Sequence, residues 1–250
     1  MRVLHLCATI KGGAFIAAQR LVESLNQTKE VSAEHLVFEN DKKSMPYLTY
    51  WADNIVKEKI TLLNHVLEKA FFLFYEKNKE TRFSFSLSNT GVDITNHPLF
   101  RKADCIHFHW INKGFLSFNG IKKIINTGKP IVWTMHDMWP FTGGCHYSGS
   151  CLRFTSRCGK CPFLRTQSEQ DLSTRIQEEK NKIFSTGNIQ FITPSDWLRK
   201  EAEKSIILKD KEIKTIRNTI DLQKFSPVEN KNELKKKLGL NPEKFVILWN

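Results

Sequence analysis

The sequence predicts an α/β fold in which a Rossmann-like parallel sheet carries helices on both faces. Short apolar segments of strand length alternate along the chain with longer segments of helical periodicity, which is the order that a parallel sheet requires. The first strand ends in a glycine turn that leads directly into a helix, as at the start of doubly wound folds. The 250 residues, 40% of them hydrophobic, can bury a sizeable core.

The individual elements follow from this alternation. We expect a strand over residues 2–9 and a helix after the turn Lys11–Ala14. The further strands are expected at 34–38, 103–110, 131–135, 189–193 and 214–220, and the further helices at 55–82, 120–127, 170–184 and after a cap at Ser195 or Asp196. Residues 81–98 look like an irregular connection.

The domain organisation is predicted from the last part of the chain. Residues 1–222 are expected to form one Rossmann-like domain with a cysteine-rich loop at 143–164. Residues 223–250 contain a linker, a basic helix and an apolar segment, 245–249, that reads as a strand. We interpret them as a linker and the truncated start of a second domain, because a chain rarely stops inside a strand.

Charge and composition limit the classes of partner. The formal net charge of +12 indicates a polyanion, which can be nucleic acid, an anionic membrane surface or a phosphorylated substrate. The sequence shows neither a signal peptide nor a run of about 18 apolar residues. We therefore expect a cytoplasmic protein, in which clustered cysteines bind metal or stay reduced.

Gly12 and Gly13 occupy the first predicted turn. A helix that starts there offers free backbone N–H groups to a phosphate. The two glycines can equally serve only to permit a tight turn, because the full dinucleotide-binding fingerprint is absent.

The segment 55–82 has two interpretations. Its apolar stripe at helical spacing consists of Ile55, Leu62, Leu63, Val66, Leu67, Ala70, Phe71 and Phe74. The stripe can pack into the core and leave a basic face to solvent, or it can lie in a membrane interface. The aromatic run 71–75, which includes Phe72 and is followed by basic residues, favours the membrane interface.

Histidines mark the ends of two predicted strands. His107 and His109 share one face of a strand, where they can bind a metal or, more commonly, serve as hydrogen-bonded pocket residues. The next strand delivers His136 and Asp137, placed to act as a general base, a hydrogen-bonding group for a sugar or a metal ligand. A nucleophilic hydrolase is disfavoured, because the sequence has no G-x-S-x-G motif.

Four cysteines follow with the spacing C-x5-C-x6-C-x2-C, namely Cys145, Cys151, Cys158 and Cys161. The Cys-Gly-Lys-Cys knuckle suits a tetrahedral zinc ion, and His146 can replace Cys145 as a ligand. Reduced or disulfide-paired structural cysteines, or a catalytic thiol, are the alternatives. We expect a structural zinc and no catalytic cofactor.

Six blocks together resemble a known family: GGA, HWINKGFLS, KPIVWTMHDMWPFTGGCHYS, CGKCP, TPSDWL and RNTIDLQKFSP. They are similar to family-4 glycosyltransferases of bacterial cell-surface polysaccharide pathways, most closely a colanic-acid-type subgroup with a cysteine loop. The resemblance implies a GT-B fold of two facing Rossmann-like domains. It also implies a hexosyltransferase that moves a sugar from a nucleotide-sugar to a lipid-linked or polysaccharide acceptor with retention of configuration.

The resemblance also assigns roles to residues. Gly12 and Gly13 would lie near the donor diphosphate, His136 would face the transferred sugar, and Asp137 would orient that histidine or its loop. The other residues that it places at the donor and acceptor site are His109, Trp110, Ser195 and Asn218. The donor-binding domain of the family is missing from this sequence, so the resemblance implies an acceptor-binding part that transfers no sugar alone.

The partners implied are a nucleotide-sugar, a lipid-linked saccharide and an anionic membrane surface contacted by residues 55–82, at the inner leaflet of the inner membrane. A non-catalytic remnant that binds only acceptor or membrane would have the same sequence. A zinc-stabilised nucleic-acid-binding module is disfavoured, because the basic residues do not form one stripe, and we expect no nucleic acid partner.

Overall fold

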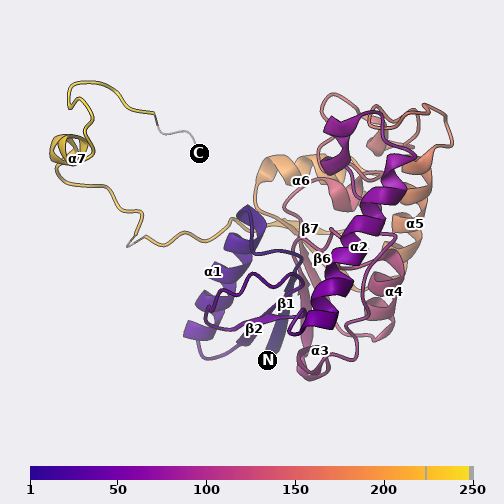
Figure 1. The fold of residues 1–250 in the computed structure, drawn as a ribbon, viewed down its shortest axis with the longest axis horizontal. Helices are drawn as coiled ribbons and strands as arrows, with labels where there is room; N and C mark the ends of the chain where they lie inside the picture. Colours follow the sequence, from indigo (N-terminus) through magenta and orange to yellow (C-terminus); the bar gives the residue numbers. More distant parts are fainter. Residues whose placement is uncertain (223, 248–250) are drawn as a thin grey trace. The chain divides into compact units, whose positions relative to one another are not determined.

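The computed structural model describes residues 1–222 and 224–247, and the chain divides into two compact units, Met1–Asn218 and Thr219–Asn250. The first unit contains one parallel sheet of seven strands in the order β3-β2-β1-β4-β5-β6-β7 (Figure 1). The strands are β1 (Arg2–Cys7), β2 (Ser32–Val37), β3 (Leu48–Tyr50), β4 (Cys105–Phe108), β5 (Ile131–Thr134), β6 (Ile189–Thr193) and β7 (Ile213–Thr215). The predicted α/β fold with a Rossmann-like sheet is confirmed.

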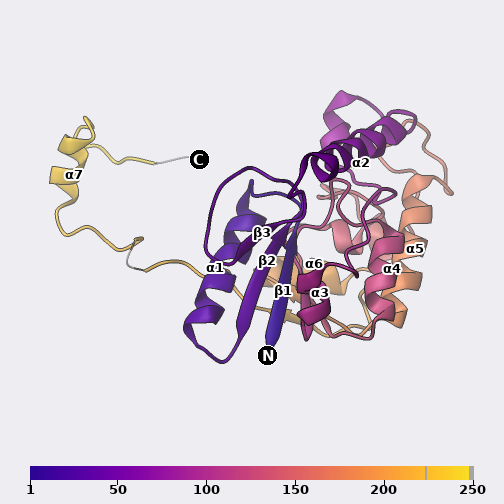
Figure 2. The same ribbon diagram turned by 60° about the horizontal axis from the view of Figure 1, so that its bottom comes forward.

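Helices lie on both sides of this sheet (Figures 1 and 2). The α-helices are α1 (Gly13–Gln27), α2 (Ile55–Leu73), α3 (Pro98–Lys102), α4 (Phe118–Asn126), α5 (Leu172–Thr186) and α6 (Asp196–Glu203), with α7 (Lys231–Lys237) in the second unit. Three short 3-10 helices are η1 (Lys79–Phe83), η2 (Trp139–Phe141) and η3 (Arg153–Thr155). Polar N-caps set several helix starts: Asn54, Ser117, Asp171 and Ser195 accept backbone N–H groups of α2, α4, α5 and α6.

The strand order places a switch point between β1 and β4. From β1 the chain proceeds to β2 and β3 on one side, and then returns to β4 and continues outward on the other side. Loops that leave β1 and β4 therefore diverge at their carboxyl ends, which is where ligands bind in open α/β sheets. Large buried aromatic side chains fill the core beside this point, among them Trp133, whose ring lies edge-on to Phe184 at 5.3 Å between ring centroids.

Helix α2 is shorter than predicted. It ends at Leu73, and the chain then leaves the helix because Glu76 forms a β-bridge with Leu164 and Lys77 N–H donates to the carbonyl of Phe163. The backbone of residues 76 and 77 thus bonds to the cysteine-rich segment and does not continue the helix toward residue 82.

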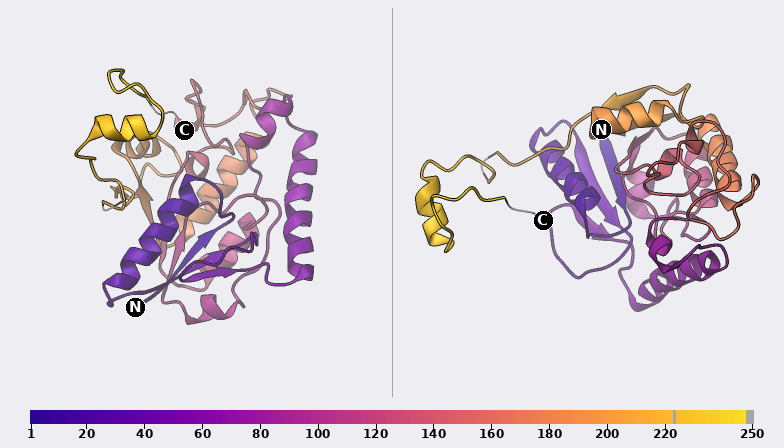
Figure 3. Two further views of the ribbon diagram at one scale, coloured as in Figure 1. Left: turned by 60° about the vertical axis from the view of Figure 1, so that its left-hand side comes forward. Right: turned by 90° about the horizontal axis from the view of Figure 1, so that it is seen from above.

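The apolar stripe of α2 faces outward, and α2 lies at the periphery of the first unit in both views of Figure 3. Leu62 and Phe74 are 64% and 77% exposed, whereas the buried residues of the helix are Thr61, Glu68 and Phe72. The Glu68 carboxylate accepts the backbone N–H groups of Leu87 and Gly114, so α2 is attached through a polar contact. The interpretation that this stripe packs into the core is wrong.

Smaller differences concern edge elements. The three-residue strand β3 was not predicted, and β7 covers only the beginning of the predicted segment 214–220. At the end of the chain, residues 245–247 belong to no strand, and the rest of the predicted strand lies outside the described residues.

Candidate functional site

A cleft of about 460 Å³, large enough for a small ligand, opens at the carboxyl ends of the central strands. Its lining consists of Cys7, Thr9, Lys11, Gly12, Gly13, Ala14, Trp110, His136, Asp137, Tyr147, Pro194 and Asn218. Six predicted site residues therefore meet in one place, although they come from four separate segments of the chain.

The amino terminus of α1 forms one wall of the cleft. Gly12 has a φ of 93°, a left-handed conformation that favours glycine. A Cβ atom at Gly13 would meet nothing within 4 Å, so the space in front of the helix is open to a ligand. The first turn of α1 contains no acidic residue, and Lys11 lines the same wall. These features together favour an anionic group there.

His136 forms the opposite part of the cleft. Its Nε2 lies 3.0 Å from Nδ1 of His109, which is buried beneath it. Burial lowers the pKa of His136 to about 4, although the Asp137 carboxylate acts in the opposite direction. The side chain is therefore neutral near pH 7, where it can donate one hydrogen bond and accept another.

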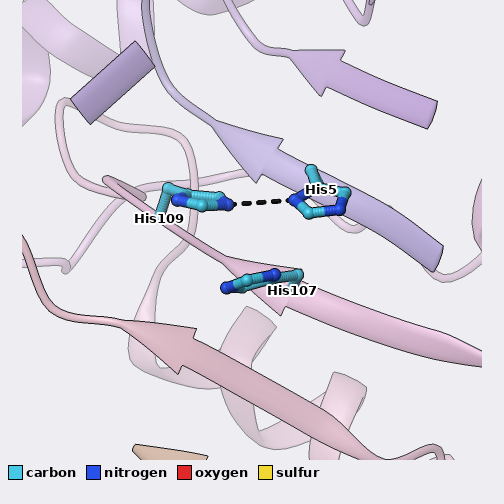
Figure 4. A group of neighbouring side chains, drawn as sticks. All are labelled: His5, His107 and His109. Atoms are coloured by element: carbon cyan, nitrogen blue, oxygen red, sulfur yellow. Dashed lines mark hydrogen bonds between the residues drawn. The ribbon is translucent and has the colours of Figure 1, made fainter. Parts of the chain in front are cut away.

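A row of buried histidines supports His136 from below. Figure 4 shows His5, His107 and His109 together, with Nδ1 of His5 lying 3.0 Å from Nε2 of His109. The rings of His107 and His109 stack with 4.3 Å between centroids, and Nε2 of His107 lies 2.8 Å from Oγ1 of Thr134. Burial lowers the pKa of all three, so they are neutral imidazoles.

These three histidines meet the geometric requirement for a metal site within the described part of the chain, because one nitrogen of each lies within 4.8 Å of the others. However, both nitrogens of His109 already have hydrogen-bond partners, and Nε2 of His107 is paired with Thr134. Hydrogen bonding thus accounts for His107 and His109 as pocket histidines, the commoner of their two predicted roles.

Asp137 organises the loop after β5. Its Oδ1 accepts the backbone N–H of Trp139 at 2.8 Å, and its Oδ2 accepts from Trp110 Nε1 at 3.1 Å and lies 2.7 Å from Nδ1 of His146. Burial raises the pKa of Asp137, but His146 and these donors outweigh it and hold the pKa below its ordinary value. The resemblance implied that Asp137 orients either His136 or the loop, and these hydrogen bonds match orientation of the loop.

Other predicted residues lie elsewhere. Ser195 does not line the cleft, because its hydroxyl caps α6 by accepting the N–H of Leu198. Its neighbour Pro194 occupies that part of the wall. Lys11 and Tyr147 were not predicted; their positions beside the glycine pair and the cysteine loop were the only signal in the sequence.

A second cavity of about 520 Å³ lies on the other side of Thr9 and Lys11, which line both spaces. It reaches α2 and is bordered by charged and polar side chains, including Glu39, whose carboxylate pairs with Lys113 at 2.5 Å. Leu62, in the exposed stripe of α2, also lines this cavity. The cavity therefore lies between Thr9 and Lys11 of the cleft and Leu62 of the apolar face of α2.

The four clustered cysteines form no disulfide, and all four line one small cavity. Burial raises the pKa of Cys158 and of Cys161 to about 12, which disfavours a nucleophilic thiolate in this environment. Both ring nitrogens of His146 are engaged, with Asp137 and Ser86, which disfavours its use as a metal ligand in place of Cys145.

A parallel sheet with an anion-binding helix terminus at its switch point is typical of proteins that bind nucleotides or other phosphates. No protein-family model matches the chain. Over 129 residues it is 29% identical to WcaC of Escherichia coli (strain K12), a protein named for a glycosyl transferase role in colanic acid biosynthesis. The match covers 49% of this chain and 32% of that relative. This similarity supports a relationship to glycosyltransferases.

Among the described residues, no helix is both long enough and apolar enough to cross a membrane.

Proposed function

We propose that the chain is the acceptor-binding part of a retaining hexosyltransferase of the GT-B, family-4 type that builds cell-surface polysaccharide. The observation that carries this proposal is the pairing of a neutral His136 with the open amino terminus of α1 across one cleft. The similarity to a colanic acid glycosyl transferase agrees with it.

The two walls of the cleft suit the two reacting parts of such a transfer, the departing diphosphate and the transferred sugar. The donor diphosphate would lie against the N–H groups after Gly13 and near Lys11, where the departing phosphate gains negative charge. His136, being neutral, would donate a hydrogen bond to a hydroxyl of the transferred sugar or to an adjacent oxygen. The nucleotide itself would be held mainly by a second domain, of which residues 223–250 would contain the linker and the start.

The acceptor would enter from the side of α2. We propose a lipid-linked saccharide whose sugar occupies the second cavity and whose lipid stays in the bilayer beside the exposed stripe of α2. The net charge of +12 and the exposed Lys59, Lys77 and Lys79 favour an anionic surface. With such an acceptor, the protein would act in the cytoplasm, peripherally on the inner leaflet.

The test is a transfer assay with the full-length protein, a panel of uridine- and guanosine-diphosphate hexoses, and a polyprenyl-diphosphate saccharide as acceptor. We expect transfer with one donor, and a loss of about 100-fold in kcat/KM for His136→Ala, because it removes a group that contacts the reacting sugar. His97→Asn is the matched control, since His97 caps α3 outside the cleft and asparagine can also cap.

Absence of transfer with every donor, or unchanged activity of His136→Ala, would contradict the proposal. The alternative of a non-catalytic remnant predicts acceptor or vesicle binding without transfer, even for the full-length protein.

A further inference from the structure

The four cysteines of the segment after β5 surround one cavity of about 20 Å³, which has room for about one atom of the size of a water molecule. The rest of its lining includes the rings of Phe85, Phe154 and Phe163. Thr142, Ser148, Arg153 and Ser173 also line it, but the four thiols are its only soft ligand groups. Four thiols around a space of this size suit one soft metal ion.

The backbone of the knuckle is already shaped around its sulfur atoms. Burial raises the pKa of both Cys158 and Cys161, and the nearby backbone of Gly143 and of Phe163, respectively, acts in the opposite direction. Lys160 has a φ of 44°, and a Cβ at Gly159 would lie 2.6 Å from the carbonyl oxygen of Glu169. This tight, partly strained turn joins two cysteines that line the same cavity.

Helix α5 holds the knuckle in place from outside. Asp171 and Gln177 accept the backbone N–H groups of Cys161 and Cys158 at 2.8 and 2.7 Å. Thr174 donates its hydroxyl to the carbonyl of Cys158 at 2.8 Å. Such outer contacts are what fixes ligand positions in metal sites.

A buried lysine lies beside the cavity. Lys180 is fully buried and donates to the carbonyl of Thr142 at 3.0 Å. Burial lowers its pKa from 10.5 to about 7, and Cys145 and Cys158 act in the opposite direction. A zinc ion with four thiolates carries two negative charges, so a nearby ammonium group would stabilise it.

The segment 142–171 itself has little regular structure. Apart from η3 and two isolated β-bridges, this described stretch contains no helix or strand. Irregular segments of this length are uncommon in compact domains without an additional constraint.

We propose that Cys145, Cys151, Cys158 and Cys161 bind one structural Zn²⁺ ion. The only described group with three ligand atoms within 4.8 Å of one another is the histidine group, so zinc binding requires the four thiols to rotate toward the cavity that they line. The ion would stabilise the segment that positions His146 beside Asp137. The same segment contacts the chain after α2 through the β-bridge between Glu76 and Leu164.

The experiment is metal analysis of the untagged full-length protein, purified under reducing conditions from zinc-supplemented medium. We expect one zinc per chain, loss of the ion in Cys158→Ser with Cys161→Ser, and retention in Cys105→Ser, since Cys105 lies in β4 outside the cavity. Substitution of cobalt for zinc in the unmodified protein should give the intense visible absorption of tetrahedral sulfur ligation, a readout that does not depend on a variant that folds.

Zinc-free protein that also fails to take up added zinc or cobalt would overturn the proposal. So would a metal content that survives the double cysteine substitution but disappears in His107→Gln, because the ion would then belong to the histidine row. A cobalt spectrum typical of nitrogen ligation would have the same meaning.

Discussion

At the scale of single residues, the hydrogen bonds of the histidine row determine which nitrogen of His136 carries its proton. A neutral imidazole has one N–H, and His109 lies between two other rings, so it donates to one and accepts from the other. Nε2 of His5 is buried without a partner among the described residues. A buried N–H without an acceptor costs more free energy than a buried unprotonated nitrogen without a donor. His5 should therefore carry its proton on Nδ1 and donate it to His109.

It follows that His109 donates to Nε2 of His136, and that the proton of His136 resides on Nδ1, the nitrogen that is not bonded to His109. We predict that His109→Phe, which keeps the ring but removes this donor, lowers kcat about 10- to 100-fold with little change in the KM of the donor sugar. The direct measurement is the pair of ¹⁵N chemical shifts of His136, which should show a protonated Nδ1 in the unmodified protein and a tautomer mixture in the variant.

His107→Gln serves as the control, because His107 bonds to Thr134 and not to His136. A protonated Nε2 in the unmodified protein, or identical shifts in His109→Phe, would show that His109 does not position His136.

At the scale of elements, α2 presents an apolar face that no described part of the first unit covers, although it is attached through Glu68 and Phe72. We predict that Phe71→Ser with Phe74→Ser weakens binding to phosphatidylglycerol vesicles at least about tenfold, because a phenylalanine buried in an apolar medium contributes roughly 1.5 kcal/mol or more. Phe72 is excluded from the test, since it is buried and stacks on Phe85 at 4.9 Å.

Vesicle co-sedimentation measures this directly. The matched control is Ile220→Ser with Leu222→Ser, which removes two exposed apolar side chains outside α2. Undiminished sedimentation of the α2 variant, or an equal decrease in the control, would show that this helix does not hold the protein at a membrane.

The same element shows what the sequence could and could not provide. The alternation of strands and helices, the glycine turn and the position of His136 after a strand follow from local sequence patterns. The stripe of α2 has the periodicity of a core helix, but the residues of α2 that the structure buries are Thr61, Glu68 and Phe72. Likewise, His5 meets His109 across the pairing of β1 with β4, a contact between residues 104 positions apart that no local pattern encodes.

At the scale of the whole molecule, the buried histidines should make stability depend on pH. The pKa values of His35 and His107 are lowered by burial from 6.5 to about 3, and that of His136 to about 4. The unfolded chain therefore binds protons near pH 6.5, while the folded chain does so only near pH 3 to 4. Their contribution to stability is complete above pH 6.5 and is lost as the pH falls toward these lower values.

We predict that the free energy of unfolding in urea decreases steeply from about pH 7 to about pH 5, with each such histidine adding up to about 1.4 kcal/mol per pH unit to the slope. His35→Gln should reduce the slope by about one histidine's share, because glutamine can still pair with Gln19 but does not titrate. A slope that is flat over this range, or unchanged in His35→Gln, would contradict the prediction. It would mean that these rings bind protons as readily in the folded chain as in the unfolded chain. Because His35, His5 and His107 lie on the adjacent strands β2, β1 and β4, a charge on one of these rings would be repelled by a charge on another in the centre of the sheet.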